Sequence, residues 1–216
     1  MRYVSVFSGV EAATLAWDQL GWEPVAFSEI DPFPSAVLAE RFPDVPNLGD
    51  ITQIDWSQIG AVDLVVGGSP CQSFSVAGKR EGLAGASGLM FEYIRCVREL
   101  RPRWFVWENV PGALSSEGGV AFGQLLTEMD DLGYGLAWRV LDAQFFGVAQ
   151  RRRRVFLVGS LGDGGRNELA RFYLSPRACD GILRRAEKRG KPLPPELKMA
   201  LEAQAAPEQS SESTTP

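Results

Sequence analysis

The stretch GGSPCQSFS at residues 67–75 places Cys71 directly after a proline, at the end of a run of apolar residues. A thiol at the carboxyl end of a core strand lies where ligands bind in open α/β sheets, and neighbouring backbone N–H groups can lower its pKa. The thiolate of such a cysteine is a nucleophile. A buried, unreactive thiol is the ordinary alternative, and it suits Cys96 and Cys179, which lie within helical patterns.

Glu108 and Asn109 end the next apolar run, WFVWEN, and a Val-Pro-Gly turn comes after them. A carboxyl group at the end of an apolar strand is costly to desolvate unless it is paired or used. In such a place it can hold its proton near neutral pH and donate it to a substrate. Glu108 is therefore a candidate acid for the chemistry of Cys71.

Four consecutive arginines at 151–154 lead into a further apolar run, RVFLVGS. Strand alternation through them predicts that Arg152 and Arg154 point to one face, and Arg151 and Arg153 to the other. Two guanidinium groups directed at one cleft suit phosphate or carbonyl oxygens.

The sequence contains no histidine, which excludes Ser-His-Asp hydrolysis and histidine metal sites, so no metal is expected. Acid–base work falls to carboxylates, cysteine, lysine or tyrosine. Three cysteines form no disulfide framework and fit a reducing cytoplasm. The net charge of −5 gives no sign of nucleic-acid binding by itself, although basic residues cluster at 151–154 and 184–191.

A second group of candidates lies near the amino terminus. FSG at 7–9 reads as a tight turn after an apolar run, and Glu29 ends the next run twenty residues past Gly9. In α/β nucleotide sites an acid at that distance hydrogen-bonds ribose hydroxyls. A short strand ending at Asp50 and Ile51 is expected at the same sheet edge. The missing Gly-x-Gly-x-x-Gly favours a nucleoside cofactor without phosphates.

Apolar segments alternate with helical patterns along most of the chain. Strands are expected at 3–7, 24–30, 63–70, 103–109 and 154–160, and helices at 10–21, 33–42, 88–101 and 118–132. Strands that are apolar along their whole length are usually covered on both faces. This order predicts an α/β fold with a doubly wound, mostly parallel sheet.

The character of the sequence changes after Gly159, and three regions are expected: a domain over 1–160, a connector with helices over 161–203, and a disordered tail over 204–216. Within the second, Pro176 at a first helical position and Gly190 as a stop predict a helix. No apolar run approaches the roughly 20 residues of a membrane helix. The amino terminus has no secretory signal, so a cytoplasmic location is expected.

These blocks together closely resemble the C5-cytosine DNA methyltransferases, which use S-adenosylmethionine. The resemblance spans roughly residues 3–160 and rests on FSG at 7–9, Glu29, GDI at 49–51, GGSPCQSFSVAGKREGL at 67–83, ENV at 108–110 and Gln-x-Arg-x-Arg at 150–154. It implies a Rossmann-like methyltransferase fold with a helical C-terminal extension, an S-adenosylmethionine-binding catalytic domain over 1–160, and double-stranded DNA as the substrate. The later helical segment is similar to the region that phage and prophage enzymes carry after this core, and it could begin a target-recognition region.

The resemblance also implies a role for each matched residue. Cys71 would attack C6 of a flipped-out cytosine and Glu108 would contact N3, while Arg152 and Arg154 would hold the base or its flanking phosphate. The implied cofactor contacts are Phe7, Ser8, Gly9, Glu29, Ile30, Asp50, Ile51 and Pro70. The implied DNA contacts are Gln72, Ser73, Ser75, Lys79, Arg80 and Asn109.

The sequence departs from the family pattern in two places. FSGVEA carries Glu11 and Ala12 where the family has glycines, and residues 160–216 show neither an Arg-x-x-Thr-x-x-Glu-like motif nor the closing segment of the cofactor pocket. One interpretation is a methyltransferase whose remaining part comes from a second polypeptide or lies outside this sequence. The others are a truncated or split module that binds S-adenosylmethionine or DNA without activity alone, and an RNA cytosine methyltransferase.

Overall fold

The computed structural model divides the chain into two units, Met1–Ala170 and Arg171–Pro216. It describes residues 1–70, 87–115, 119–162 and 176–188, together with positions 190, 193, 198, 199, 201, 202 and 205. Most of the tail expected at 204–216 lies outside the described residues. Two further segments lie outside the described residues: 71–86, which follows Pro70, and 163–175 in the expected connector.

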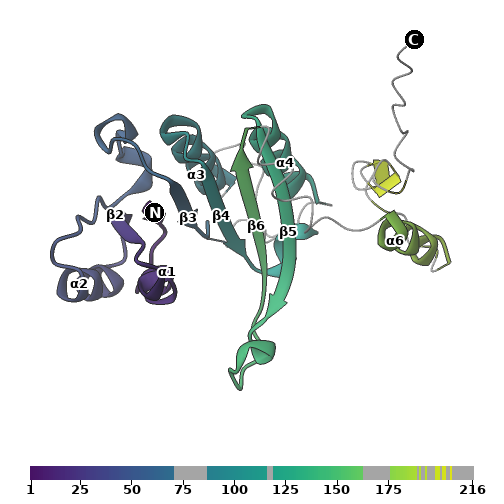
Figure 1. Cartoon of the computed structure of the whole chain (residues 1–216), viewed down its shortest axis with the longest axis horizontal. Helices are drawn as coiled ribbons and strands as arrows, with labels where there is room; N and C mark the ends of the chain where they lie inside the picture. Colours follow the sequence, from purple (N-terminus) through teal and green to yellow (C-terminus); the bar gives the residue numbers. More distant parts are fainter. Residues whose placement is uncertain are drawn as a thin grey trace, which may run out of the picture. The chain divides into compact units, whose positions relative to one another are not determined.

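A six-stranded sheet in the order β2-β1-β3-β4-β6-β5 runs through the described part of the first unit (Figure 1). Its strands are β1 (Arg2–Val6), β2 (Glu23–Ser28), β3 (Leu64–Gly67), β4 (Trp104–Asn109), β5 (Tyr134–Asp142) and β6 (Arg153–Leu161). The first four strands of that order pair in parallel, whereas β6 is antiparallel to both of its neighbours. The predicted α/β fold with a mostly parallel sheet is confirmed.

Helices cover both faces of the sheet. The α-helices of the first unit are α1 (Ala12–Trp17), α2 (Pro32–Arg41), α3 (Ser87–Leu100) and α4 (Val120–Asp131). Short 3-10 segments are η1 (Asp18–Leu20), η2 (Ile51–Gln53), η3 (Trp56–Gln58), η4 (Pro111–Leu114) and η6 (Ala143–Phe146). Successive residues of a strand point to opposite faces. Tyr3 accordingly packs on Trp17 of α1, while Val4 joins the core cluster that includes α3 and α4.

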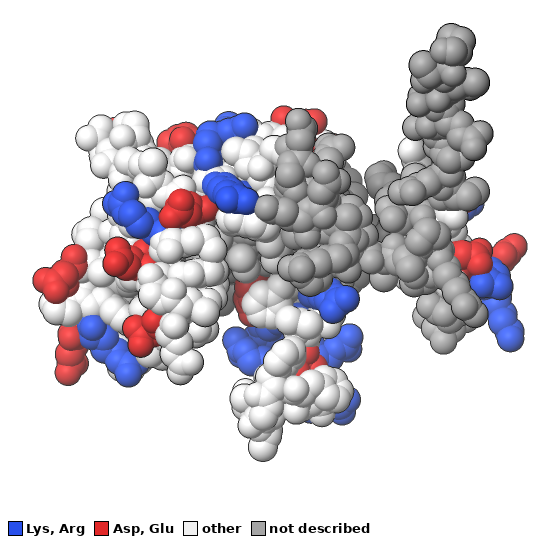
Figure 2. Space-filling view, in the orientation of Figure 1, with Lys and Arg blue, Asp and Glu red and all other residues white. Residues whose placement is uncertain are grey.

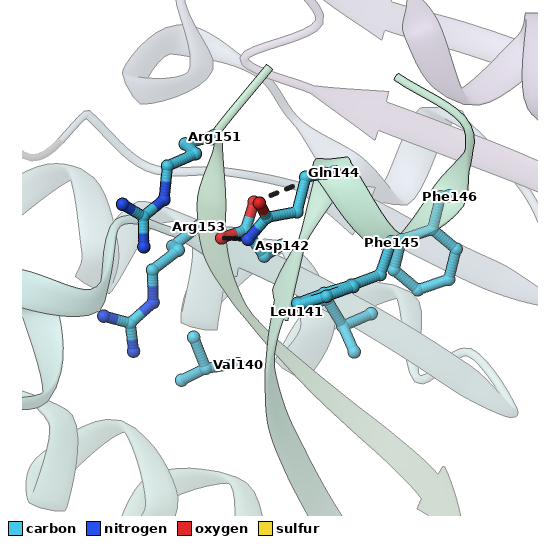
Figure 3. Close-up of a pocket in the computed structure, with 8 residues that line it drawn as sticks. All are labelled: Val140, Leu141, Asp142, Gln144, Phe145, Phe146, Arg151 and Arg153. Carbon is cyan, nitrogen blue, oxygen red and sulfur yellow. Dashed lines mark hydrogen bonds between the residues drawn. The ribbon is translucent and has the colours of Figure 1, made fainter. Parts of the chain in front are cut away.

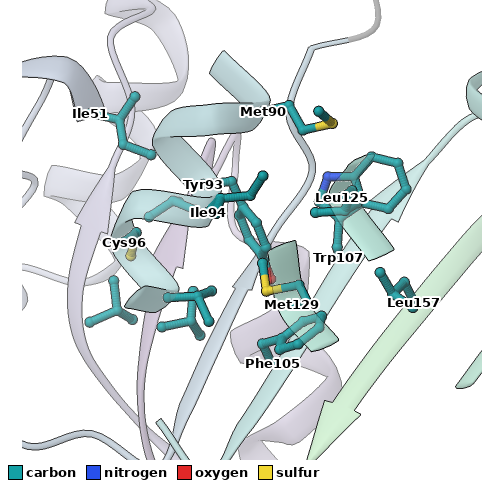
Figure 4. Packing of buried hydrophobic residues seen from close by; sticks show 14 of the residues in the cluster. Ile51, Met90, Tyr93, Ile94, Cys96, Phe105, Trp107, Leu125, Met129 and Leu157 are labelled. Atoms are coloured by element: carbon teal, nitrogen blue, oxygen red, sulfur yellow. The ribbon is translucent and has the colours of Figure 1, made fainter. Parts of the chain in front are cut away.

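The largest apolar cluster lies between the sheet and helices α3 and α4 (Figure 4). Tyr93 of α3 and Leu125 of α4 are fully buried, and Phe105 of β4 packs edge-on against both Tyr93 and Tyr134. Aromatic pairs of this geometry add roughly 0.5–1.5 kcal/mol each beyond the burial of their area. The cluster fixes β4, and therefore Glu108 at its end, in a rigid frame.

Two local expectations differ from the structure. Strand β5 was not expected, because Trp138, Arg139 and Val140 in its middle are exposed and leave no apolar run. The short strand expected to end at 49–51 is wrong. Only Asn47 forms a bridge to β2, and Asp50 caps the 3-10 helix η2 by accepting the N–H of Thr52 at 2.9 Å.

The second unit contains α6 (Pro176–Lys188), which begins at the expected proline. Gly190 has a φ of 58°, the left-handed conformation that suits a helix stop. Cys179 on this helix and Cys96 on α3 are both buried, as expected for structural thiols. Among the described residues, no helix is long and apolar enough to cross a bilayer, and no group of metal-binding side chains is present.

Candidate active site

Glu108 and Arg154 form an ion pair at the edge of the sheet where β3 and β4 end. Arg154 Nε lies 2.9 Å from Glu108 Oε1, and both side chains are partly exposed. The pair is brought together because Glu108 sits opposite Phe156 in the antiparallel β4–β6 pairing, which places Arg154 two residues along the same face. A charge-assisted contact of this kind fixes the direction of both groups.

The chain leaving β3 passes directly beside Glu108. A Cβ built at Gly68 would lie 2.8 Å from Glu108 O and 2.9 Å from Glu108 Oε2, closer than side chains normally approach. Only glycine therefore leaves room for the carboxylate at this point. The segment Gly67–Pro70 thus passes beside Glu108 of the ion pair, and Cys71 is the next residue in the sequence.

Asn109 anchors the segment that precedes Cys71. Its Nδ2 donates to Ser69 O at 2.9 Å, and its Oδ1 accepts the N–H of Val110 at 2.9 Å. Trp107 Nε1 donates to Ser69 Oγ at 3.2 Å. Asn109 is 3% exposed. One donor and one acceptor position of the amide are thus used inside the protein, and the expected contact of Asn109 with DNA stays a prediction.

Cys71 and most of the expected DNA contacts fall in the loop after Pro70. Those that lie outside the described residues are Cys71, Gln72, Ser73, Ser75, Lys79 and Arg80. The structure describes the residues on both sides of this segment, which are Pro70 before it and Ser87 after it.

Arg152 lies in the connection between β5 and β6, directly before β6, and is exposed. Its backbone N–H donates to Asp142 Oδ1 at 3.1 Å, and its carbonyl accepts the N–H of Ala143 at 3.1 Å. The backbone is thus held while the guanidinium group extends from the hairpin. Arg152 and Arg154 remain candidates for contacts to a substrate.

The expected cofactor loop between β1 and α1 uses left-handed backbone at three positions. The angle φ is 54° at Phe7, 56° at Gly9 and 62° at Glu11. Glycine adopts this conformation readily, whereas each other residue there costs on the order of 1–3 kcal/mol. The loop is tied to the end of β2, because Gly9 N donates to Glu29 Oε2 at 2.8 Å.

Glu29 is held in place by hydrogen bonds with Gly9, Asp31 and Asn47. Its Oε1 accepts the N–H of Asp31 at 2.8 Å, in addition to the contact of Oε2 with Gly9. Asn47 accepts from Glu29 N and donates to Glu29 O, each at 3.0 Å. A carboxylate has about four acceptor positions, so each oxygen keeps one for a ligand hydroxyl.

The loop after β1 contacts the end of β2, and the end of β2 in turn contacts the segment at 49–51. Ser8 N donates to Ser28 O at 3.2 Å, and Ser28 Oγ donates to Gly49 O at 2.8 Å. Seven of the eight expected cofactor residues therefore share one edge of the sheet, and Pro70 comes after the end of neighbouring β3. The side chains differ in exposure: Ile51 is buried, Phe7 and Glu29 are half-buried, and Ile30, Asp50 and Pro70 are exposed.

Glu11 is a feature of this loop that sequence reasoning did not predict. It is 1% exposed, and its Oε1 accepts from Thr14 N at 3.0 Å and Thr14 Oγ1 at 3.1 Å. Tyr3 completes the chain with a contact of 2.6 Å between its hydroxyl and Thr14 Oγ1. Glu11 Oε2 has no partner among the described residues. Burial raises the pKa of this carboxyl above its ordinary value.

Replacing Glu11 by glutamine is expected to flatten the dependence of stability on pH. A raised pKa in the folded state means that the contribution of the protonated carboxyl is present below the ordinary value of 4.5 and is lost as pH rises through the folded value. The free energy of unfolding should therefore fall less in the variant than in the wild type between about pH 4.5 and pH 8. Denaturant titrations across that range measure it, with exposed Glu23→Gln as the control, and parallel profiles for all three proteins would contradict it.

Known proteins place this arrangement in a family. The family model described as C-5 cytosine-specific DNA methylase matches residues 1–209. The chain is 41% identical over 213 residues to a protein of Escherichia phage P1 named DNA N-6-adenine-methyltransferase, with 73% of this chain and 28% of the relative covered. It is 35% identical over 198 residues to the type II methyltransferase M.AquIA of Picosynechococcus, with 83% of this chain and 77% of the relative covered.

A solved structure supports the fold. A DNA modification methyltransferase encoded within an E. coli prophage aligns with a TM-score of 0.64 and 24% identity, covering 74% of this chain and 47% of the other. The described sheet and helices are thus an α/β fold that is also found in a methyltransferase. The chain belongs to the C-5 cytosine-specific DNA methylase family. It spans 28–42% of the length of seven other curated relatives.

Proposed function

We propose that the chain transfers a methyl group from S-adenosylmethionine to C5 of a cytosine flipped out of double-stranded DNA. The observation that carries this proposal is the Glu108–Arg154 ion pair beside Gly68, at the point where the chain leads into Pro70 and Cys71. The carboxyl of Glu108, the guanidinium of Arg154 and the thiol of Cys71, which follows Pro70 in the sequence, would supply the three groups that such chemistry at a pyrimidine ring needs.

Cytosine C5 is a poor nucleophile until C6 is attacked. The thiolate of Cys71 would add to C6, and the ring would then carry electron density at C5. Glu108 would donate a proton from Oε2 to N3 and so neutralise that charge. Arg154 would hold Glu108 and the base in place. C5 would take the methyl group from the sulfonium of S-adenosylmethionine, which would leave as S-adenosylhomocysteine. Loss of the C5 proton with departure of the Cys71 thiolate from C6 would then restore the aromatic ring.

S-adenosylmethionine would supply an electrophilic methyl group from a site at the carboxyl ends of β1 and β2, next to those of β3 and β4. Glu29 would accept hydrogen bonds from the ribose, since its carboxylate is already oriented and keeps open acceptor positions. Asp50 would accept from the adenine amine, because within the described part of the chain its Oδ2 makes no contact. Phe7, Ile30 and Ile51 would contribute apolar surface, and Pro70 would border the methyl group.

A covalent trap tests the proposal directly. DNA duplexes that carry 5-fluorocytosine at every cytosine avoid the need to know the target sequence, and fluorine blocks loss of the group at C5. We expect wild-type protein with S-adenosylmethionine to form an adduct that survives a denaturing gel, whereas Cys71→Ser forms none. Cys96→Ala and Cys179→Ala are the matched controls and should keep the adduct. Equal adduct from Cys71→Ser would refute the proposed nucleophile.

Two observations favour other functions and are separated by the same assay. The name of the phage P1 relative points to methylation of the adenine amine, although most of that relative lies outside the matched part. The absence of an Arg-x-x-Thr-x-x-Glu-like motif from residues 160–216 favours a module that binds S-adenosylmethionine or DNA without turnover. An adenine enzyme would yield N6-methyladenine and no adduct, and a binding module would yield neither adduct nor methylated nucleoside.

A further inference from the structure

The hairpin of β5 and β6 extends past the end of β4. Asn109, the last residue of β4, pairs with Val155, so Arg153 and Arg151 lie beyond it. Asp142 pairs with Arg153, and η6 forms the tip. Figure 1 shows the hairpin projecting beyond the other strands. Because Glu108 precedes Asn109 on β4, the hairpin projects from the edge that carries the proposed catalytic pair.

An open cavity of about 470 Å³ lies at the tip of this hairpin. Its lining includes Val140, Asp142, Phe145, Phe146, Arg151 and Arg153. Figure 3 shows Arg151 and Arg153 side by side, with side chains that extend in the same direction. Phe145 and Phe146 lie on the other side of Asp142 and Gln144. Arg154 is absent from the lining because alternation turns it toward Glu108 on the opposite face.

The cavity carries positive charge that the described protein does not neutralise. Arg151 and Arg153 are exposed, and within the described part of the chain no carboxylate forms an ion pair with either guanidinium. The carboxylate of Asp142 is engaged by Gln144 N at 3.3 Å, Gln144 Nε2 at 2.9 Å and Arg152 N at 3.1 Å. Basic side chains flank the projecting hairpin on the face in Figure 2.

The same cavity presents unusually exposed aromatic surface. Phe145 is 79% exposed and Phe146 is 66% exposed, and Val140 beside them is exposed as well. Large apolar side chains that gather at the surface commonly mark a binding site. Paired arginines next to aromatic rings match a ligand that is anionic and also has flat apolar faces, which describes nucleic acid. The overall charge of −5 makes this local basic surface a specific feature.

We propose that the cavity is a second DNA contact, separate from Glu108 and Arg154. Arg151 and Arg153 bind two phosphates of the strand beside the target cytosine, and Phe145 and Phe146 contact its sugars or bases. The proposal rests on the proposed function, because it takes the DNA substrate as the ligand. It assigns this hairpin the task of gripping DNA while the edge of the sheet carries out the chemistry.

The salt dependence of DNA binding tests the arginines. Each phosphate that is neutralised contributes about 0.9 to the slope of log affinity against log salt, so Arg151→Gln/Arg153→Gln should reduce the slope by about 1.8. Arg41→Gln is the control, because Arg41 is exposed in the last turn of α2 and lies away from the cavity; its slope should match the wild type. An unchanged slope in the double variant would overturn the arginine contact.

The aromatic side chains have a separate signature. Phe145→Ala/Phe146→Ala should weaken DNA binding by at least about 5-fold, as expected for lost stacking, with the salt slope unchanged because no charge is removed. Wild-type affinity in this variant would refute the aromatic contact. Lower thermal stability together with wild-type DNA affinity would show that the two rings pack against protein instead.

The 5-fluorocytosine adduct keeps this proposal apart from the proposed function. If the wild type forms the adduct but the arginine variant keeps the wild-type salt slope, the cavity proposal fails and the proposed function stands. If the wild type forms no adduct but its DNA binding loses slope in the arginine variant, the cavity binds DNA and the proposed chemistry fails. Binding of S-adenosylmethionine, measured by calorimetry, serves as the folding control for each variant.

Discussion

Replacing Glu108 by glutamine is expected to lower the rate of methyl transfer by about 10²–10⁴-fold, the usual contribution of a positioned acid or base. The side chain keeps its shape but loses the charge that pairs with Arg154 and the proton exchange that N3 requires. Single-turnover transfer of labelled methyl groups to DNA measures the rate. Affinity for S-adenosylmethionine should stay close to that of the wild type, because the expected cofactor residues lie on other strands.

The effect of Arg154→Ala should not add to that of Glu108→Gln. Arg154 Nε contacts Glu108 Oε1 at 2.9 Å, so removing either partner disturbs the same group, and the double variant should lose little more than one single variant. Arg98 and Glu128 provide the matched control, since they form an ion pair of 2.8 Å between α3 and α4. Neutralising that pair should leave the rate unchanged. Fully additive losses at Glu108 and Arg154 would contradict a shared site.

Asn109→Ala is expected to lower the single-turnover rate by about 100-fold while changing affinity for DNA little. The side chain holds Ser69, and an error of about 1 Å in placing a reacting group can cost this much. Asn109→Asp should not restore the rate, because it lacks the Nδ2 donor. The control is Gln124→Ala, which removes an exposed amide from α4.

A different result would support the expectation, drawn from the sequence, that Asn109 contacts DNA. If Asn109→Ala weakens DNA binding and leaves the rate of bound complexes unchanged, Asn109 is a DNA contact after all. The split between rate and affinity therefore decides between a positioning residue and a binding residue. Thermal denaturation shows whether the loss of two buried hydrogen bonds also destabilises the fold.

The sequence predicted the strands that are apolar along their whole length. β4 was expected at 103–109 and runs Trp104–Asn109, because burial on both faces leaves an unbroken apolar signal. β5 gave no such signal, since it is an edge strand with Trp138 and Arg139 exposed. The strand predicted to end near Asp50 was wrong, because the Asp50 side chain accepts the N–H of Thr52 and so favours a 3-10 turn.

Some features of the candidate site could be predicted from the sequence, and others could not. The family resemblance implied that Glu108 and Arg154 act on the same base, and the antiparallel register of β4 and β6 explains how they meet. The environment of Asn109 depends on a partner 40 residues away, Ser69, which no local pattern reveals. Glu11 was likewise hidden, because a charged residue after a glycine turn suggests solvent, whereas its contacts with Thr14 bury it.

The reversed direction of β6 also limits how the chain order can change. Because this strand starts where β3 and β4 finish, Arg154 arrives beside Glu108; the same strand laid parallel would carry Arg154 to the opposite edge, about 20 Å away at roughly 3.3 Å per residue. A circular permutant that opens the chain in another loop keeps this polarity and with it the ion pair. Strand polarity, rather than the order of motifs along the sequence, is therefore the property that a rearranged chain has to preserve to keep the Glu108–Arg154 pair.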